Sequence, residues 1–565
     1  MSTVIQSNAQ SNADRTRRWC RTQRAERFEQ YLELHAQGLS LRQAAKVLEV
    51  PRSTLQAWRV YQESLDEHPA VVAFFQSSPG LAFLHRLVLG IHLVCTEVGA
   101  CGIRLVCLLL QLTRLDRFVA ASYGIQQQVN RQVEEAMVTY RREESARLAT
   151  GMPTRDITLA QDETFTGGLC LVAAEPKSNY IVLEQAAQGR DQDTWLALME
   201  KALSGLNCQV MQSTSDEAPG LLAYVEHHLG AHHSPDVFHV QHELVKAVSG
   251  PLATKQRAAA KAAHETQERL AQVPGHLREA GDAPDKRGPG RPPQAAASLE
   301  QLAQEAHAAR QELERISVQR EQVAQSIRTI GQVYHLVDLE RGVRRNGRLI
   351  AADIHTQMDT IRRVAQQEGL SQTCLERIDK AARVVPKMQA TIEFVSRYVH
   401  QQVRQLDLSP PVSYALHAQL IPSFYLERVA QSRTVQAGEP LRELAERLRA
   451  PLFEPGGALA ELSRAQHRQL TQQAKELADV FQRSSSNVEG RNGYLSLRNH
   501  QLRGLARPRK RECLTAVHNF FLTRPDGTTA AERFFGQKPR SMFAAILQSV
   551  DLPPAPLSPP RRVEG

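Results

Sequence analysis

Residues 157–165 constrain the fold most, because they combine the alternation of a half-buried strand with two adjacent acids. Ile157 and Leu159 alternate with polar residues, and Asp162 and Glu163 follow before a Thr-Gly-Gly turn. A carboxylate on a central strand is costly unless a cation or another partner compensates its desolvation. The segment therefore predicts a sheet with an acidic functional site.

The neighbouring residues extend this strand into an α/β pattern. Aliphatic and β-branched runs predict further strands, and apolar residues at helical spacing predict the helices between them. The expected strands are 169–174, 180–183, 208–212 and 236–239, and the expected helices are 193–203, 221–229 and 241–248. This order is typical of an RNase H-like α/β domain, whose first half we place at 151–250.

A second acid falls where such a domain would use it. Asp216 follows the strand expected at 208–212, and functional groups gather at the carboxyl ends of strands in mixed sheets. Carboxylates are the hard ligands that Mg²⁺ prefers, and two such ions can activate the attacking oxygen and stabilise the leaving one in phosphodiester cleavage. Glu163 and Glu217 are rival ligands because a one-residue error flips the face of a strand, and Asp236 is a secondary candidate. The alternative is that these are ordinary surface or turn acids.

The N-terminal region predicts DNA-binding helices. We expect a disordered basic arm at 1–23 and a helix-turn-helix at 24–68, with capping boxes at 40–43 and 53–56 on either side of a break at Pro51. In a major-groove recognition helix, the DNA-facing residues would be Arg52, Ser53, Thr54, Gln56 and Arg59. A three-helix protein-docking module is the alternative.

Residues 69–150 predict a further helical region. The apolar stretch 81–112 carries five charged or histidine residues, so it favours a buried helix pair over a membrane span. Residues 96–135 are consistent with a second helix-turn-helix or with an α-helical spacer.

The charge of the chain indicates its class of partner, and its cysteine content indicates the compartment. The chain has 69 Lys and Arg against 60 Asp and Glu, a net charge of +9, which suits a polyanionic partner such as DNA. Its eight cysteines form no CxxC pair, and the N-terminus lacks an apolar signal core. We therefore expect a reducing, cytoplasmic, nucleoid-associated location and no membrane partner.

Residues 251–480 predict an all-helical insertion. A linker near 280–297 contains Gly-Arg-Pro centred on Arg291, which looks like an AT-hook whose arginine enters a narrow minor groove and makes Arg291 a DNA-binding candidate. Its flanks are less basic than in that motif, which favours a solvated linker. Apolar residues from 299 to 337 follow a heptad seam, broken only at Arg320, so a long helix pairs with another helix. The pattern leaves open whether that partner lies in the same chain or in a second subunit.

The stretch 484–504 is dense in polar functional groups. Glu489 lies near the start of an expected helix, where an acid is favoured electrostatically. Arg491, Arg498 and Arg503 are candidates for phosphate contacts, although a basic solvated helix is the alternative. We place the second half of the core at 481–545 and a disordered tail at 546–565.

At these motifs the chain resembles the DDE-class transposases of bacterial insertion sequences. The matching residues are Asp162 in Gln-Asp-Glu-Thr, Asp216 in Ser-Asp-Glu-Ala and Glu489 in Asn-Val-Glu-Gly-Arg-Asn, together with a C-terminal motif at 526–536. The resemblance covers roughly 150–250 and 484–545, and the long gap before Glu489 implies an inserted helical domain.

The resemblance implies a DNA transposase with an RNase H-like core, in which Asp162, Asp216 and Glu489 are catalytic ligands of Mg²⁺ or Mn²⁺, as two ions. It also implies cleavage at terminal inverted repeats, joining to target DNA by transesterification, and action as a homodimer. The alternatives are an RNase H-like nuclease or resolvase without strand transfer, a catalytically inactive DNA-binding regulator, and a helical scaffold that binds nucleic acid nonspecifically.

Overall fold

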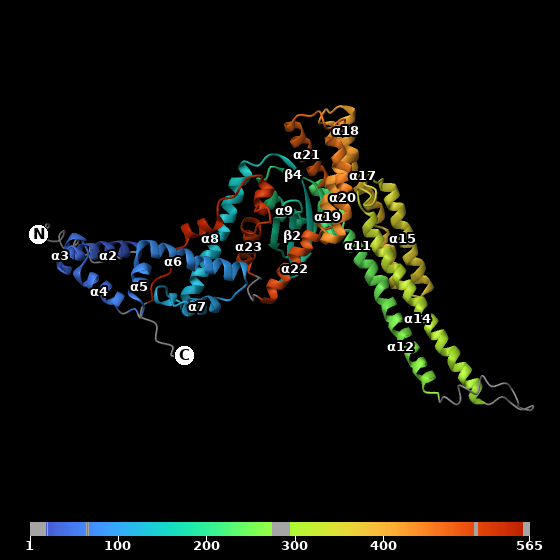
Figure 1. Ribbon diagram of the computed structural model, residues 1–565, viewed down its shortest axis with the longest axis horizontal. Coiled ribbons are helices and arrows are strands. Elements are labelled where there is room, and N and C mark those ends of the chain that lie inside the picture. The colour runs from blue at the N-terminus through green and yellow to red at the C-terminus, as the bar shows by residue number, and fades with distance from the viewer. Residues whose placement is uncertain are drawn as a thin grey trace, which may run out of the picture.

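The chain is mostly helical and encloses one small sheet. The computed structural model describes residues 19, 21–63, 65, 67–273, 294–501 and 507–556. Helices account for 69% of it, and a five-stranded mixed sheet lies near the middle of an elongated molecule (Figure 1). The predicted fold class, an α/β RNase H-like core interrupted by an all-α insertion, is therefore wrong. The strand pattern alone does not predict the class, because the largest cluster of buried residues lies at 237–481, among helices outside the sheet.

The sheet has the order β3-β2-β1-β4-β5. Its strands are β1 Arg155–Thr164, β2 Cys170–Glu175, β3 Tyr180–Ala186, β4 Cys208–Ser215 and β5 His232–Pro235. Central β1 pairs antiparallel with β2 and parallel with β4. The strands predicted from 157 to 212 are confirmed within a few residues. The strand predicted at 236–239 is wrong, because Asp236 instead caps helix α11, Val237–Leu244.

The two faces of the sheet are buried by different helices. Ile157 and Leu159 of β1 join a cluster with Trp195 of α9, Gln192–Leu203, and with residues of α10 (Pro219–Tyr224), α23 (Pro508–Ala516) and α24 (Ala530–Phe535). On the other face, Ala160 and three β2 residues pack against Val488 of α22, Ser486–Gln501. Since side chains alternate along a strand, Asp162 shares the α22 face with Ala160.

Three short helices form the N-terminal unit, at the blue end of the ribbon in Figure 1. They are α2 Arg21–Ala36, α3 Leu41–Val47 and α4 Arg52–Glu63, and they bury Phe28, Tyr31, Ala44 and Leu55. The capping box at Ser40 and Gln43 is confirmed. The one predicted at 53–56 is wrong, because α4 already begins at Arg52, directly after Pro51.

Residues 96–135 do not form the short helices of a second helix-turn-helix, which was one of the two alternatives for them. Residues 118–122 lie outside the α-helices, and the helix expected at 125–131 belongs to the 28-residue α8, Tyr123–Thr150. Before it come α5 Pro69–Gln76, α6 Ser78–Ile91, a π-helical turn η1 His92–Val98 and α7 Ile103–Leu112. Within the described residues, Ser78–Val98 is one helical stretch long and apolar enough to cross a membrane, by length and composition alone. Leu84, Val88 and Leu89 on it are fully buried.

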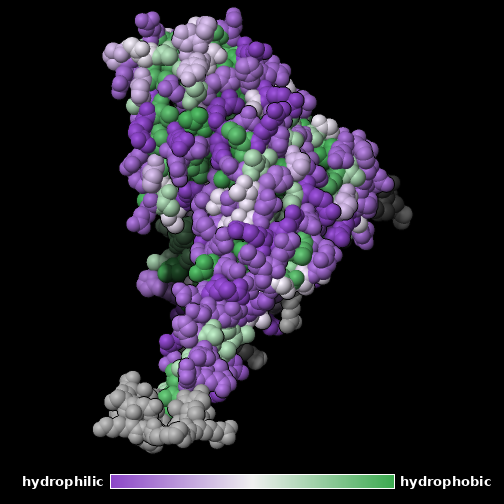
Figure 2. All heavy atoms as spheres, turned by 90° about the vertical axis from the view of Figure 1, so that its right-hand side faces the viewer, coloured by the Kyte–Doolittle hydropathy of each residue, from purple (hydrophilic) through white to green (hydrophobic). Residues whose placement is uncertain are grey.

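A long helical hairpin projects from the opposite end. Helix α12, Gly250–Ala271, packs along α14, Gln294–Val333, so the partner of the predicted seam lies in the same chain. Seen from this side, the surface is mostly hydrophilic with scattered apolar residues (Figure 2). The other helices here are α15 Gly347–Gln367, α16 Gln372–Ala382, α17 Val385–Arg404, α18 Pro410–Ala415, α19 Ile421–Gln431, α20 Val435–Phe453 and α21 Arg464–Ala478.

The predicted tail at 546–565 is partly wrong. Helix α25, Met542–Ser549, buries Ile546, and the carbonyl of Pro554 accepts a hydrogen bond from the amide of Ala120. The chain therefore stays packed on the N-terminal helices at least to this point.

Candidate functional site

Asp162 lies near the carboxyl end of β1, on the face covered by α22. Its Oδ2 accepts a hydrogen bond of 2.8 Å from Asn492 Nδ2, and its Oδ1 accepts one of 2.8 Å from the Glu163 amide. Asn492 belongs to α22, so this contact joins residues 330 positions apart. Asp162 is thus held from two directions by neutral donors.

Asp216 follows β4 directly, beside the end of β1. The parallel register places Thr214 next to Ala160, so both strands carry their acids to the same edge of the sheet. The Asp216 Oδ1 accepts a hydrogen bond of 3.2 Å from the Ala218 amide, which fixes the loop before α10. The two aspartates predicted from sequence are therefore neighbours.

Glu489 lies on the first turn of α22, one helical turn before Asn492. Burial of Val488 against the sheet fixes this end of the helix and leaves Glu489 exposed. Desolvation raises its pKa, and repulsion from Asp236 adds to that shift while His239 opposes it.

The three predicted acids are electrostatically coupled through Asp162. The pKa of Asp162 is raised to about 7, mainly by desolvation. The hydrogen bond from the Glu163 amide lowers the pKa, whereas repulsion by Asp216, Glu489 and Glu163 raises it further. Repulsion of this kind acts between like charges in the same neighbourhood. Glu489, from the far end of the sequence, thus reaches the same electrostatic neighbourhood as the two aspartates.

Ion pairing separates the predicted ligands from their rivals. Glu163 pairs with Arg190 at 3.1 Å, and Glu217 pairs with Lys387 at 2.5 Å. Across the described ranges, no ion pair involves Asp162, Asp216 or Glu489. Each rival is therefore ion-paired with a side chain of the protein, whereas the three predicted acids are not.

The three acids are suitable ligands for a hard divalent cation, but their side chains do not converge on one position. Among the residues that the structure describes, no three His, Cys, Asp or Glu side chains converge closely enough to hold a metal ion. The chemistry of the set nevertheless fits one, because the acids supply only oxygen and the desolvated Asp162 is destabilised by its like-charged neighbours. A cation would remove that repulsion.

Asp236, the secondary candidate, has a structural role. It is buried, its Oδ1 accepts the Phe238 amide at 2.7 Å, and its Oδ2 accepts the Ser485 amide at 2.9 Å and also the Ser485 hydroxyl. The carboxylate thereby joins the start of α11 to the start of α22, and both of its oxygens accept hydrogen bonds from the protein.

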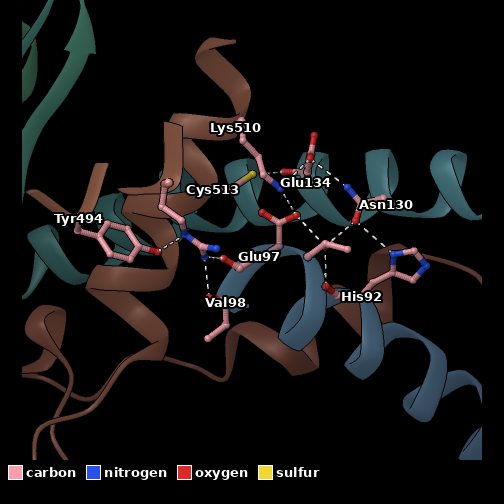
Figure 3. A network of polar contacts seen from close by, with 10 residues as sticks. His92, Glu97, Val98, Asn130, Glu134, Tyr494, Lys510 and Cys513 are labelled. Atoms are coloured by element: carbon pink, nitrogen blue, oxygen red, sulfur yellow. Dashed lines mark hydrogen bonds and ion pairs between the residues drawn. The ribbon is translucent and has the colours of Figure 1, made fainter. Parts of the chain in front are cut away.

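Two predicted phosphate contacts are buried instead. Arg491 forms a two-pronged ion pair with Glu184 of β3, and both side chains are at most 5% exposed. Arg498 donates to the Tyr494 hydroxyl at 2.8 Å and to the carbonyls of Glu97 and Val98 at the end of η1 (Figure 3). Their assignment to DNA is wrong, because both guanidiniums are used to hold α22 in place.

A second buried network lies beside this contact. Lys510 Nζ of α23 binds Glu97 at 2.6 Å and Glu134 of α8 at 3.2 Å, while Asn130 and His92 continue the chain of hydrogen bonds (Figure 3). Through Lys510 the η1 turn and α8 are joined to α23, and through Arg498 the same turn is joined to α22, the helix that carries Glu489.

The residues predicted to face DNA on α4 remain accessible. Arg52, Ser53 and Arg59 are exposed and Thr54 and Gln56 half-buried, while Leu55 between them is fully buried. Arg59 pairs with Glu63 at 3.2 Å on the same helix. The remaining two candidates, Arg291 and Arg503, lie outside the described residues.

Sequence reasoning missed two residues of this site. Asn492 escaped notice although its spacing of three from Glu489 places both on one helical face. His233 of β5 contacts the Ser215 hydroxyl at 2.9 Å, just before Asp216. Burial first, then Lys387 and His232, lower the pKa of His233 to about 4, so it adds no positive charge near Asp216 at pH 7.

Comparison with known proteins identifies one partial likeness. Residues 416–562 match a family described as a family of unknown function (DUF6399). That region runs from before α19 beyond α25 and includes Glu489 and Asn492. Neither a curated protein nor a solved structure matches the chain.

Proposed function

We propose that the protein is a DNA transposase of the DDE class, which cleaves element ends and joins them to target DNA. The observation that supports this most is the contrast in charge compensation at the sheet edge. Glu163 and Glu217 are ion-paired, whereas Asp162, Asp216 and Glu489 form no ion pair within the described residues. Like charges brought together without compensation are expensive, which is the signature of a site built for an external cation.

In this proposal Asp162, Asp216 and Glu489 hold Mg²⁺ or Mn²⁺. When bound, the ions supply an activated oxygen nucleophile and stabilise the leaving oxygen of a phosphodiester. The chain itself contributes position: β1 and β4 set the two aspartates side by side, and α22 brings Glu489 over the same face. The Arg491–Glu184 pair and the Val488 contact keep that helix on the sheet.

DNA recognition is assigned to the N-terminal unit. The exposed side chains of α4 form an accessible edge on a small buried core, as a recognition helix requires. The net charge of +9 favours association with a polyanion. Terminal inverted repeats and target DNA are the proposed substrates, with a homodimer holding two ends.

A DNA-binding regulator without catalysis is the second candidate. It is favoured by one observation, the failure of three metal-ligating side chains to converge among the described residues. A regulator would use the same α4 surface and would leave the acids as remnants. A nuclease that cuts without joining shares the proposed site and differs only in the product.

The decisive experiment uses the full-length chain and a supercoiled plasmid carrying the DNA that flanks its coding sequence. Nicking at those ends with Mg²⁺ or Mn²⁺, followed by joining to a second DNA, is expected for the wild type. Asp162→Asn, Asp216→Asn and Glu489→Gln should each lower the rate at least a hundredfold, whereas Asp193→Asn on the exposed face of α9 should not. Binding without metal-dependent nicking would establish the regulator, and nicking without joining the nuclease.

A further inference from the structure

Asn492 makes the one side-chain hydrogen bond that the described residues give to Asp162. Its Nδ2 donates to Asp162 Oδ2 at 2.8 Å, from a helix whose preceding turn carries Glu489. A neutral donor fixes the direction of a carboxylate without cancelling its charge, whereas Lys or Arg would do both. The contact therefore orients Asp162 and leaves it able to bind a cation.

The amide of Asn492 is only half used. When Asp162 is ionised it has only acceptors, so the amide nitrogen faces Asp162, as observed, and the amide oxygen points elsewhere. That oxygen is buried and accepts no hydrogen bond within the described residues. Leaving a buried acceptor without a hydrogen bond is costly, because it has lost water and gained no protein donor. Retaining the amide at that cost is expected where orientation of Asp162 matters more than stability.

We propose that Asn492 is a positioning residue of the cation site, which fixes the Asp162 carboxylate and ties its geometry to the helix that carries Glu489. The inference rests on the proposed function, because it assumes that Asp162 binds a divalent ion. It extends that proposal by adding a neutral residue from α22 to a set of acids, so that two residues of one helical face act on the same site.

The test measures Mn²⁺ binding directly, by electron paramagnetic resonance on the full chain without DNA. Asn492→Leu keeps the approximate volume and removes both polar atoms, and Asn499→Leu makes the same change elsewhere on α22. Asn492→Leu should weaken Mn²⁺ binding about tenfold or more, the usual effect of losing a group that orients a ligand. Its melting temperature should equal or exceed that of the wild type, because an unsatisfied oxygen is removed. Asn499→Leu should bind Mn²⁺ as the wild type does.

The outcomes separate the inference from the function on which it depends. A lower melting temperature with unchanged Mn²⁺ affinity would show that Asn492 is merely structural and would overturn the inference. Asn492→Ser supplies the same comparison if the leucine variant fails to fold. Asp162→Asn is the reference: if it weakens Mn²⁺ binding while Asn492→Leu does not, only the inference is lost. If Asp162→Asn binds Mn²⁺ like the wild type, the proposed function is lost as well.

Discussion

Arg491 and Glu184 form a buried ion pair that fixes helix α22 on strand β3. Arg491 Nε and Nη2 contact the two carboxylate oxygens of Glu184 at 2.5 and 2.9 Å, and the Thr515 hydroxyl donates to the same carboxylate at 2.9 Å. The pair lowers the pKa of Glu184 against the opposing effect of burial, which is the largest single influence on it. Arg491 is two residues from Glu489, so its contact with the sheet also sets the position of the proposed site.

Removing one partner of this pair should destabilise the protein strongly. Arg491→Ala leaves the Glu184 carboxylate buried without a cation, and such changes cost about 3–5 kcal/mol. The double variant Arg491→Met with Glu184→Leu replaces the pair by apolar residues of similar volume and should recover most of that loss. Urea unfolding at pH 7 measures both. A single variant as stable as the wild type would contradict the assignment.

Asp162 should make stability depend on pH in the opposite sense from most acids. Its folded pKa of about 7 lies above the unfolded value near 4, so the folded state resists its ionisation. Stability attributable to this group is present below about pH 4 and is lost as pH rises to about 7. In a chelator, Asp162→Asn should therefore be more stable than the wild type at pH 8, by at most about 4 kcal/mol, and nearly equal at pH 4. Urea unfolding of both proteins across this range, with Asp193→Asn as control, checks the trend.

Charge on α4 should contribute to DNA affinity through phosphate contacts. Arg52→Ala and Arg59→Ala should each weaken binding and reduce the slope of log affinity against log salt by about 1. Arg348→Ala, an exposed arginine on α15, should leave both unchanged. Fluorescence anisotropy with labelled end DNA at several salt concentrations measures the slopes. Equal effects from all three variants would argue for nonspecific binding by a helical scaffold.

Lys510 should be essential for the packing of α23 against η1 and α8. It is 12% exposed and neutralises Glu97, which is fully buried, as well as Glu134. Lys510→Met should cost about 3–5 kcal/mol, because it leaves buried like charges together. Hydrogen exchange should then quicken in α22, α23 and η1 before the helices of the α12–α14 hairpin. Uniform exchange throughout the chain would instead indicate a single cooperative unit.

Local sequence patterns predicted the individual helices and strands well but the fold class poorly. The alternation from Ile157 and the capping box at Ser40 depend on near neighbours, and both elements formed as expected. Asp236 was misassigned to a strand because the partner that makes it a cap residue, Ser485, lies 249 positions away. Arg491 and Arg498 were misassigned for the same reason: sequence shows the charge but not the distant acid or carbonyl that satisfies it. The prediction of the fold class was wrong because the class depends on how much helix surrounds the sheet.

The α12–α14 hairpin is long enough to convert a small rotation at its base into a large displacement at its far end. Forty residues of continuous α14 correspond to roughly 60 Å at 1.5 Å per residue. A rotation of roughly 10° at the base, of the kind seen in hinge motions, would carry the distal end through about 10 Å. Small rearrangements around α11, which joins β5 to the base of the hairpin, would thus be magnified at the distal ends of α12 and α14, far from the acids at the sheet edge (Figure 1).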